Sequence, residues 1–254
     1  MTLVEEIDSA VAAGRDPGGI EVVGVAKRFG RVTALDGVNL RVRPGEVMTV
    51  LGHNGAGKST LLRILATTVI PDAGNASVDE KDVVADPAAA RSRIGLMMAE
   101  QRSFYWRLSG RENLRFFASL RGIRGAAGTT AVEEVLGLVG MIEAADRRMD
   151  GYSSGMRARI GVARCLLGDT KVLLLDEPTA SLDPVAARML RQLFVSVTAQ
   201  RKLAVLFATH DLHEAATVAT QTAILAAGRV ATTLPGGTPA TVLEEALVAC
   251  TPMA

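Results

Sequence analysis

The stretch Gly52-His53-Asn54-Gly55-Ala56-Gly57-Lys58-Ser59-Thr60 fits the phosphate-loop pattern G-x-x-x-x-G-K-[ST]. Residues 47–51, which precede it, are mostly apolar and β-branched, and they predict a short buried strand. Residues 61–66, which follow it, are good helix formers. A strand, a glycine-rich loop and a helix in this order predict a site for a nucleoside triphosphate.

The chemistry of the loop residues supports this prediction. Gly52, Gly55 and Gly57 allow the backbone to approach phosphates closely, so that its N–H groups form an anion-binding nest at a helix N-terminus. A lysine charge about 4 Å from a phosphate contributes on the order of 4 kcal/mol at an effective dielectric near 20, against ~0.3–1 kcal/mol from the helix dipole. Lys58 is therefore expected to dominate phosphate binding, and the Ser59 hydroxyl is expected to bind magnesium.

Composition limits the classes of protein to which this chain can belong. Its 254 residues carry a net charge of +1, which gives no electrostatic case for binding nucleic acid. Hydrophobic residues make up 48% of the chain, but no run of about 18 apolar residues predicts a membrane-spanning helix. The first residues show no signal-peptide pattern, and Cys165 lies in an apolar run that predicts a buried thiol. We therefore expect one domain with two lobes in a reducing, cytoplasmic setting.

Strand and helix patterns alternate along the chain. Strand patterns cover residues 20–23, 38–42, 76–78, 171–175, 203–207 and 223–226. Strands that alternate with helices predict an α/β fold with a mostly parallel sheet. The segment 97–164 is rich in arginine and in helical patterns, which indicates an inserted helical lobe. The expected boundaries are 1–19 for an N-terminal extension, 20–240 for the main domain and 241–254 for a C-terminal tail.

A second part of the site is predicted from Leu173-Leu174-Leu175-Asp176-Glu177, an apolar strand that ends in two carboxylates. Sheets of α/β proteins bind their ligands at the C-terminal ends of the strands. Asp176 is suited to hold Mg²⁺ through water, and Glu177 is suited to orient and polarise the attacking water. Upstream, Tyr152-Ser153-Ser154-Gly155-Met156 opens a helix whose N-terminus forms a second anion site. Either the chain binds two anions, or each helix end serves a different copy of the nucleotide site.

Four motifs in order resemble those of the nucleotide-binding subunit of an ATP-binding cassette (ABC) transporter: the phosphate loop, Y-S-S-G-M, L-L-L-D-E-P-T-A-S-L-D-P and A-T-H-D. The resemblance covers residues 20–236. It implies a P-loop NTPase fold with an antiparallel β subdomain and an inserted helical lobe, with ATP and Mg²⁺ as ligands and ATP hydrolysis as the activity. It further implies that two cassettes, expected to be identical copies, pack head to tail around two ATP molecules. Such a pair drives an integral membrane permease from the cytoplasmic face of the membrane.

The resemblance also assigns roles to individual residues. Ser153 and Gly155 are expected to touch the γ-phosphate of the ATP that the partner binds, and Asp183 is expected to cross the dimer interface. His210 is expected to contact the γ-phosphate and to hold the catalytic glutamate and its water in place. Phe29 matches the aromatic residue that stacks on adenine, with a plain core phenylalanine as the alternative. The expected catalytic residues are Lys58, Glu177 and His210; the ATP-binding residues are Phe29, Gly52, Asn54, Gly55, Ala56, Gly57, Lys58, Ser59, Thr60, Ser153, Gly155 and Asp183; and the metal ligands are Ser59, Asp176 and Gln101.

Two positions depart from the pattern of the family. Ser154 and Met156 stand where the family sequence L-S-G-G-Q has a glycine and a glutamine, while the serine and the second glycine that bind the anion are retained. The glutamine that binds magnesium is expected shortly after Ile94-Gly95. Counting back from Leu108-Ser109 points to Glu100, whereas a shift of one residue points to Gln101, which we favour.

Aromatic and arginine residues interleave in the helical segment. The rings are Phe104, Tyr105, Trp106, Phe116 and Phe117. One interpretation places them in the core of the helical lobe, and this is favoured for Phe116-Phe117. Three consecutive aromatic residues in a loop cannot all point inward, so the loop 104–106 is expected to form a socket for a helix of the membrane subunit.

The motifs lead to two alternative functions. The stretch from Arg102 to Leu114 resembles exporters of polysaccharides, lipids or drugs more than nutrient importers. The alternative is a soluble ABC ATPase that acts on nucleic acid or ribosomes. A single set of motifs, the near-neutral charge and the absence of sustained heptads between Lys58 and Ser153 favour the transporter subunit.

Overall fold

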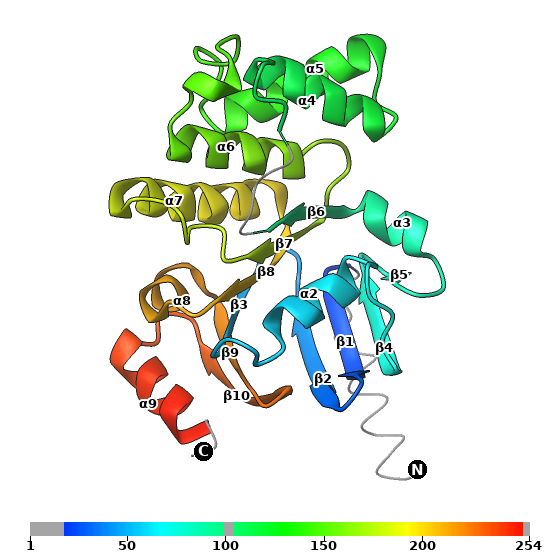
Figure 1. Ribbon diagram of the computed structural model, residues 1–254, viewed down its shortest axis with the longest axis vertical. Helices are drawn as coiled ribbons and strands as arrows, with labels where there is room; N and C mark the ends of the chain where they lie inside the picture. The colour runs from blue at the N-terminus through cyan, green and yellow to red at the C-terminus, as the bar shows by residue number, and fades with distance from the viewer. Residues whose placement is uncertain (1–17, 99–103, 251–254) are drawn as a thin grey trace.

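The strand that precedes the phosphate loop lies inside a mostly parallel sheet. The computed structural model describes residues 18–98 and 104–250. Its main strands are β3 (Val47–Leu51), β6 (Ile94–Met97), β7 (Val172–Asp176), β8 (Ala204–Thr209), β9 (Gln221–Ala226) and β10 (Arg229–Pro235). Among the described residues these six strands pair in the order β10-β9-β3-β8-β7-β6, and only β10 runs antiparallel to its neighbour (Figure 1).

Helices cover both faces of this sheet, which explains the continuous apolar runs of its central strands. Every residue of β3, β7 and β8 is buried. On β8, Leu206 packs into the core shared with α2 (Lys58–Leu65), whereas Phe207 belongs to the core on the opposite face. There its ring meets Phe194 of α7 (Pro184–Arg201) edge to face, with the ring centroids 6.0 Å apart. Each such buried side chain contributes roughly 1.5–3 kcal/mol to folding.

A second sheet is antiparallel and packs beside α2. It has the order β2-β1-β4-β5 and consists of β1 (Ile20–Phe29), β2 (Val32–Val42), β4 (Ala73–Val78) and β5 (Lys81–Asp82). The first two strands are longer than the strand patterns at 20–23 and 38–42 predicted. Register shifts, one of them between Val22 and Val25, interrupt the alternation of buried and exposed residues on which the prediction depended. The chain then enters α3 (Pro87–Ser92), which Asp86 caps.

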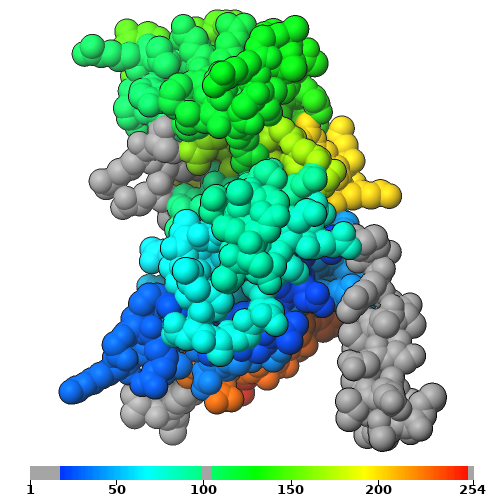
Figure 2. Space-filling model, turned by 90° about the vertical axis from the view of Figure 1, so that its right-hand side faces the viewer, coloured from blue at the N-terminus to red at the C-terminus, as the bar shows by residue number. Residues whose placement is uncertain are grey.

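A layer of helices lies above the main sheet in Figure 1 and forms the green block at the top of Figure 2. It consists of α4 (Gly110–Leu120), α5 (Gly125–Leu138), the short 3₁₀ helix η1 (Met149–Gly151) and α6 (Ser154–Cys165). Ser109 and Glu112 form a capping box that starts α4. Leu114, Val135 and Ile160 join the three α-helices in one core with β7 and α7. Cys165 is buried as predicted, and burial raises the pKa of its thiol.

The C-terminal part contains structure that the sequence analysis did not predict. Strand β10 forms a hairpin with β9, and helix α9 (Ala240–Cys250) follows where only a tail was expected. Leu243 and Leu247 of α9 pack against Leu51 of β3 and Ala215 of α8 (Leu212–Val218). The spacing of the two leucines, one helical turn apart, is the signal that predicts such a packed helix. None of the helices in the described residues is both long and apolar enough to cross a bilayer.

Candidate active site

The phosphate loop joins β3 to α2, and its shape depends on glycine. Gly57 caps α2 with φ 111°, and a Cβ atom at this position would collide with the carbonyl oxygen of Ala34. A Cβ atom on Gly52 would collide with the carbonyl oxygen of Leu225 in β9. Gly55 has φ 83°. The loop is therefore held closely between β2 and β9, with the N-terminus of α2 directly behind it.

Lys58 is the first residue of α2 and is buried inside the loop. Its Nζ atom donates hydrogen bonds to the carbonyl oxygens of Gly52 at 2.6 Å and His53 at 3.1 Å. Burial lowers the pKa of Lys58, and the carboxylates of Glu177 and Asp176 oppose this shift. The lysine is thus held by carbonyl oxygens of its own loop, in the place where phosphate oxygens are its stronger acceptors.

Asp176 is the last residue of β7 and is almost fully buried. Burial raises the pKa of its carboxyl group, as does the neighbouring Glu177, while a hydrogen bond from Ser59 and the charge of Lys58 lower it. A buried carboxylate next to a hydroxyl is a donor set that suits a hard divalent cation such as Mg²⁺. A cation here would also remove the cost of burying the charge of Asp176.

The third predicted magnesium ligand lies outside the described residues. Glu100 and Gln101 both fall within 99–103, so the choice between them stays a prediction. Nowhere in 18–98 or 104–250 do three or more His, Cys, Asp or Glu side chains gather as a metal cluster. A magnesium ion at Asp176 and Ser59 would need further ligands, which phosphate oxygens and water can supply beside the predicted Gln101.

Glu177 and His210 lie at the ends of neighbouring strands and contact each other. The Glu177 Oε1 atom is 2.7 Å from Nδ1 of His210. The strands β7 and β8 are parallel, with Asp176 opposite Ala208, so their carboxyl ends bring the two loops together. Glu177 has φ 46°, in the left-handed region, and its N–H donates to the Ala208 carbonyl oxygen at 2.9 Å. The backbone thus holds the carboxylate at the edge of the sheet, beside Asp176 and the phosphate loop.

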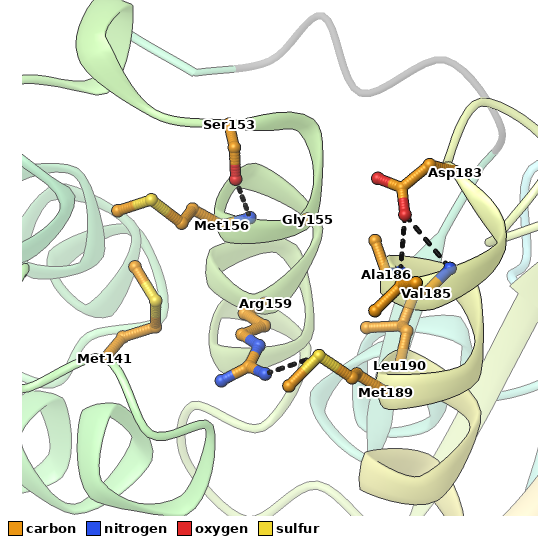
Figure 3. A pocket seen from close by; sticks show the side chains of 10 residues that line it. All are labelled: Met141, Ser153, Gly155, Met156, Arg159, Asp183, Val185, Ala186, Met189 and Leu190. Carbon is orange, nitrogen blue, oxygen red and sulfur yellow. Dashed lines mark hydrogen bonds between the residues drawn. The ribbon is translucent and has the colours of Figure 1, made fainter.

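Ser153, Gly155 and Asp183 meet in a different cavity, of about 240 Å³, at the N-termini of α6 and α7 (Figure 3). The Ser153 hydroxyl accepts a hydrogen bond from the Met156 N–H at 3.2 Å and caps α6. The Asp183 carboxylate accepts hydrogen bonds from two backbone N–H groups and caps α7. None of the residues that line this cavity comes from the phosphate loop. Within one chain the two predicted anion sites are therefore separate.

Apolar side chains form most of the rest of that cavity wall. They include Met141, Met156 and Met189, which are labelled in Figure 3. Arg159 is the basic residue of the lining, and its guanidinium lies 3.8 Å from the sulfur of Met189. Methionine adapts its shape to irregular surfaces, which suits a wall that closes against another molecule.

Phe29 and the aromatic loop differ in how far they are exposed. Phe29, at the end of β1, is 50% exposed and so is not part of the core. Tyr105 and Trp106 are 50% and 45% exposed, but Phe104 is only 4% exposed. The expectation that all three loop rings form a socket is therefore wrong for Phe104, which packs edge to face on Phe117 with the centroids 5.9 Å apart.

Exposed rings remain beside the buried ones. Phe116 is 36% exposed, so the prediction that it belongs to the core of the helical lobe is wrong. Its ring meets that of Tyr105 with the centroids 4.9 Å apart. The guanidinium of Arg157 lies 5.6 Å from the centroid of the Trp106 ring. The exposed aromatic residues of segment 104–117 are Tyr105, Trp106 and Phe116. We call these three residues the aromatic patch.

Glu214 was not predicted from the sequence; its carboxylate is 3% exposed and lines the same cavity as Glu177 and His210. The signal that could have found it is its position four residues after His210, in the first turn of α8. A charged residue there lies on the inner side of a helix that starts at the edge of the sheet.

Comparison with known proteins gives a consistent set of relatives. Residues 35–180 match the family model described as ABC transporter. The chain is 33% identical over 199 residues to the ABC transporter ATP-binding protein NatA of Bacillus subtilis, which covers 78% of this chain and 80% of NatA. It is 39% identical over 198 residues to the doxorubicin resistance ATP-binding protein DrrA of Mycobacterium tuberculosis, covering 77% of this chain and 59% of DrrA. It is 35% identical over 216 residues to the methionine import ATP-binding protein MetN of Halalkalibacterium halodurans, and the alignment covers 84% of this chain and 63% of MetN. The chain thus spans less than two thirds of the length of DrrA and MetN.

Solved structures agree with these sequence relatives. The cassette cbiO1 of Clostridium perfringens, described as part of the complex cbiONQ, aligns with a TM-score of 0.81 and 26% identity over 92% of this chain and 93% of that chain. The dimeric cassette MJ0796 aligns with a TM-score of 0.73 and 25% identity over 85% of this chain and 98% of that chain. The predicted α/β, P-loop NTPase fold is confirmed by these structures.

Proposed function

The chain belongs to the ABC transporter family and is an ATP-hydrolysing subunit, and from this we propose that it drives export by a separate integral membrane permease. It acts from the cytoplasmic face of the membrane, to which it binds as a peripheral subunit. Residues 20–240 form the ATPase domain, and the helical lobe, about 97–164, transmits its movement to the permease. Binding of ATP closes a pair of cassettes, and hydrolysis opens it again.

One observation carries the catalytic part of this proposal: Glu177 contacts His210 at the edge of the sheet, beside Lys58 and Asp176. Glu177 is placed to orient the water that attacks the γ-phosphate, and His210 holds its carboxylate. The phosphate loop, from Gly52 to Thr60, binds the phosphates. Mg²⁺, held by Ser59 and Asp176 with Gln101 as a further ligand, would neutralise charge on the phosphates. Positioning and electrostatics then account for the chemistry of phosphoryl transfer to water.

The second half of each ATP site comes from a second copy of the chain. Ser153 and Gly155 lie in a cavity apart from the phosphate loop of the same chain, which supports the alternative in which they serve the nucleotide of a partner. Asp183 lines the same cavity and lies at the interface. The relative MJ0796, described as a dimeric cassette, supports this arrangement. The partner copy therefore completes the site.

Export is supported by the relatives, and a permease partner is supported by the aromatic patch. Identity is 39% to DrrA, a drug-resistance protein, and 35% to MetN, a methionine importer, so that the exporter assignment rests on a modest difference. The exposed rings of Tyr105, Trp106 and Phe116 suit an apolar helix of the permease. The rival function, a soluble ATPase that acts on nucleic acid or ribosomes, is disfavoured by the net charge of +1, which gives no electrostatic case for binding nucleic acid.

Affinity purification from membranes of the native host tests the proposal. We expect the tagged chain to recover a protein with several membrane-spanning segments, identified by mass spectrometry. Vesicles that contain both subunits should then move substrate outward only with ATP and Mg²⁺. Recovery of ribosomes or DNA-bound proteins from the soluble fraction instead would favour the soluble ATPase. Substrate movement inward would leave the transporter assignment in place and refute export.

Phe29→Ala should raise the KM for ATP about tenfold with little change in kcat. Stacking of a base on an aromatic ring is worth about 1–3 kcal/mol, and 1.4 kcal/mol corresponds to a factor of ten. Val32, on the same hairpin and 65% exposed, gives a matched control, since Val32→Ala should leave the KM unchanged. Steady-state ATPase assays measure both constants. An unchanged KM in Phe29→Ala would exclude Phe29 as the adenine platform.

Tyr105→Ala combined with Trp106→Ala should reduce binding to the permease while ATP binding by the isolated chain persists. The two rings are exposed and belong to the patch that we assign to the permease, and loss of one anchor ring at an interface typically costs about 2 kcal/mol or more. Leu120→Ala, at the end of α4 and 68% exposed, is the control. Membrane flotation of the subunit with its permease measures recruitment. Equal recruitment of both variants would show that the patch does not face the permease.

A further inference from the structure

A buried carboxylate links the two loops that hold Glu177 and His210. Glu214 Oε2 accepts a hydrogen bond from the hydroxyl of Thr209 at 2.8 Å. Its Oε1 atom accepts hydrogen bonds from the hydroxyl of Thr179 and from the Arg191 guanidinium, the latter at 3.3 Å. Glu214 is 3% exposed, so water does not supply these contacts. One side chain of α8 thus joins β8, the loop after β7 and α7.

Two hydrogen-bond partners of Glu214 lie next to the proposed catalytic residues in the sequence. Thr209 is the last residue of β8 and directly precedes His210. Thr179 is two residues beyond Glu177, in the loop that follows β7. The loop that carries Glu177 and the loop that carries His210 are therefore both hydrogen-bonded to the same buried carboxylate.

We infer that Glu214 is a positioning residue, which sets the geometry of the Glu177–His210 pair through Thr179 and Thr209. Arg191 balances its charge. This inference rests on the proposed catalytic roles of Glu177 and His210. It adds that their contact is maintained from α8 and not by the two loops alone.

The cavity beside the pair explains why such a network is needed. It has a volume of about 370 Å³ and is lined by residues that include Glu177, His210 and Glu214. Glu177 and His210 border this cavity, so their side chains lack packing on that side and depend more on hydrogen bonds for their positions. The side chain of His210 is 57% exposed, so packing restrains it little. A displacement of about 1 Å in such a pair is enough to lower a rate by about 100-fold.

Stability alone does not explain the network. A buried ion pair is often no more stabilising than apolar residues of the same volume, because desolvation offsets the Coulomb attraction. In the described part of the chain, the Nε atom of Arg191 is buried without a hydrogen-bond partner, a further cost. The Glu214–Arg191 ion pair is thus poorly optimised for stability, yet Glu214 is hydrogen-bonded to both catalytic loops. This combination fits a role in positioning.

Substitutions at Thr209 and Glu214 test the inference. Thr209→Val removes the hydroxyl but keeps the shape, and Glu214→Gln removes the charge. Each should lower kcat about 10- to 100-fold while the KM for ATP stays within about twofold. Thr209→Ser keeps the hydroxyl and should restore kcat. Thr217→Val is the matched control on the exposed side of α8, where the hydroxyl bonds only to the carbonyl of its own helix.

A double-mutant cycle with His210→Ala separates positioning from a general loss of structure. If Glu214 acts through the pair, Thr209→Val should lower the single-turnover rate of the His210→Ala enzyme by less than threefold. Equal factors in both backgrounds would overturn the inference, as would a change confined to KM. Thermal melts identify a variant that fails to fold, and Thr209→Val then carries the test in place of Glu214→Gln. Hydrolysis that survives Glu177→Gln would instead overturn the proposed catalytic roles themselves.

Discussion

Lys58→Ala is expected to lower the affinity for ATP by about 100-fold or more. A lysine charge at a phosphate is worth on the order of 4 kcal/mol at an effective dielectric near 20, which corresponds to almost three powers of ten. Part of this is lost when ATP binds, because Nζ must leave the carbonyl oxygens of Gly52 and His53. Isothermal titration calorimetry with ATP and Mg²⁺ measures the remaining effect.

A loss of folding would imitate this result, so stability must be measured as well. Burial lowers the pKa of Lys58, which means that the folded protein holds the charged form at a cost. We therefore expect Lys58→Ala to melt no earlier than the natural protein. Arg63→Ala, on the exposed side of the same helix, is the control and should bind ATP normally. Binding of ATP by Lys58→Ala within threefold of the natural protein would remove Lys58 from its role.

The phosphate loop and the acidic end of β7 were predictable because both depend on local sequence. Glycine at positions 55 and 57 predicts left-handed backbone, and the structure has φ 83° and 111° there. Buried parallel strands are continuous apolar runs, which β7 and β8 show in the sequence. The rule that such strands present ligands at their carboxyl ends then placed Asp176 and Glu177 at the site.

Features that depend on non-local pairing were not predictable in the same way. The strands β1 and β2 extend well beyond their alternating segments, because irregular register breaks the pattern without ending the hydrogen bonding. Phe104 and Tyr105 are adjacent in sequence, yet Phe104 is buried because it packs on Phe117 at the core, whereas Tyr105 packs on the exposed Phe116. The hydrogen bonds of Glu214 form only when the loop after β7, strand β8 and helix α7 pack together.

The second anion site shows a further limit. Ser153 and Asp183 were predictable as helix caps from their residue types and from the helix patterns that follow them. Their separation from the phosphate loop is a property of the folded chain, because it depends on where α6 lies relative to α2. In the proposed dimer the ATP of a second chain occupies the cavity that they share, a contact that local sequence patterns do not encode.

Glu177→Gln should retain ATP binding, lower the rate of hydrolysis about 100- to 10,000-fold and stabilise the ATP-bound dimer. The amide has the shape of the carboxylate but cannot accept the proton of the attacking water, and a general base contributes about 10²–10⁴-fold. Removing one negative charge near the γ-phosphate also reduces repulsion of bound ATP, while Asp176 and Lys58 remain. The trapped nucleotide should then keep two chains together, with the cavity at Ser153 and Asp183 closed over it.

Light scattering coupled to gel filtration, with ATP and Mg²⁺ present, distinguishes this result from simple inactivation. Glu177→Gln should elute as a dimer with ATP and as a monomer with ADP, because in the proposed dimer the γ-phosphate is the group that reaches the second chain. Adding Gly155→Trp, which blocks the cavity without touching the phosphate loop, should abolish the dimer and leave ATP bound. A dimer that persists in this double variant would mean that the two chains meet through another surface. Full hydrolysis by Glu177→Gln would mean that a different group orients the water, and the contact with His210 would then serve structure alone.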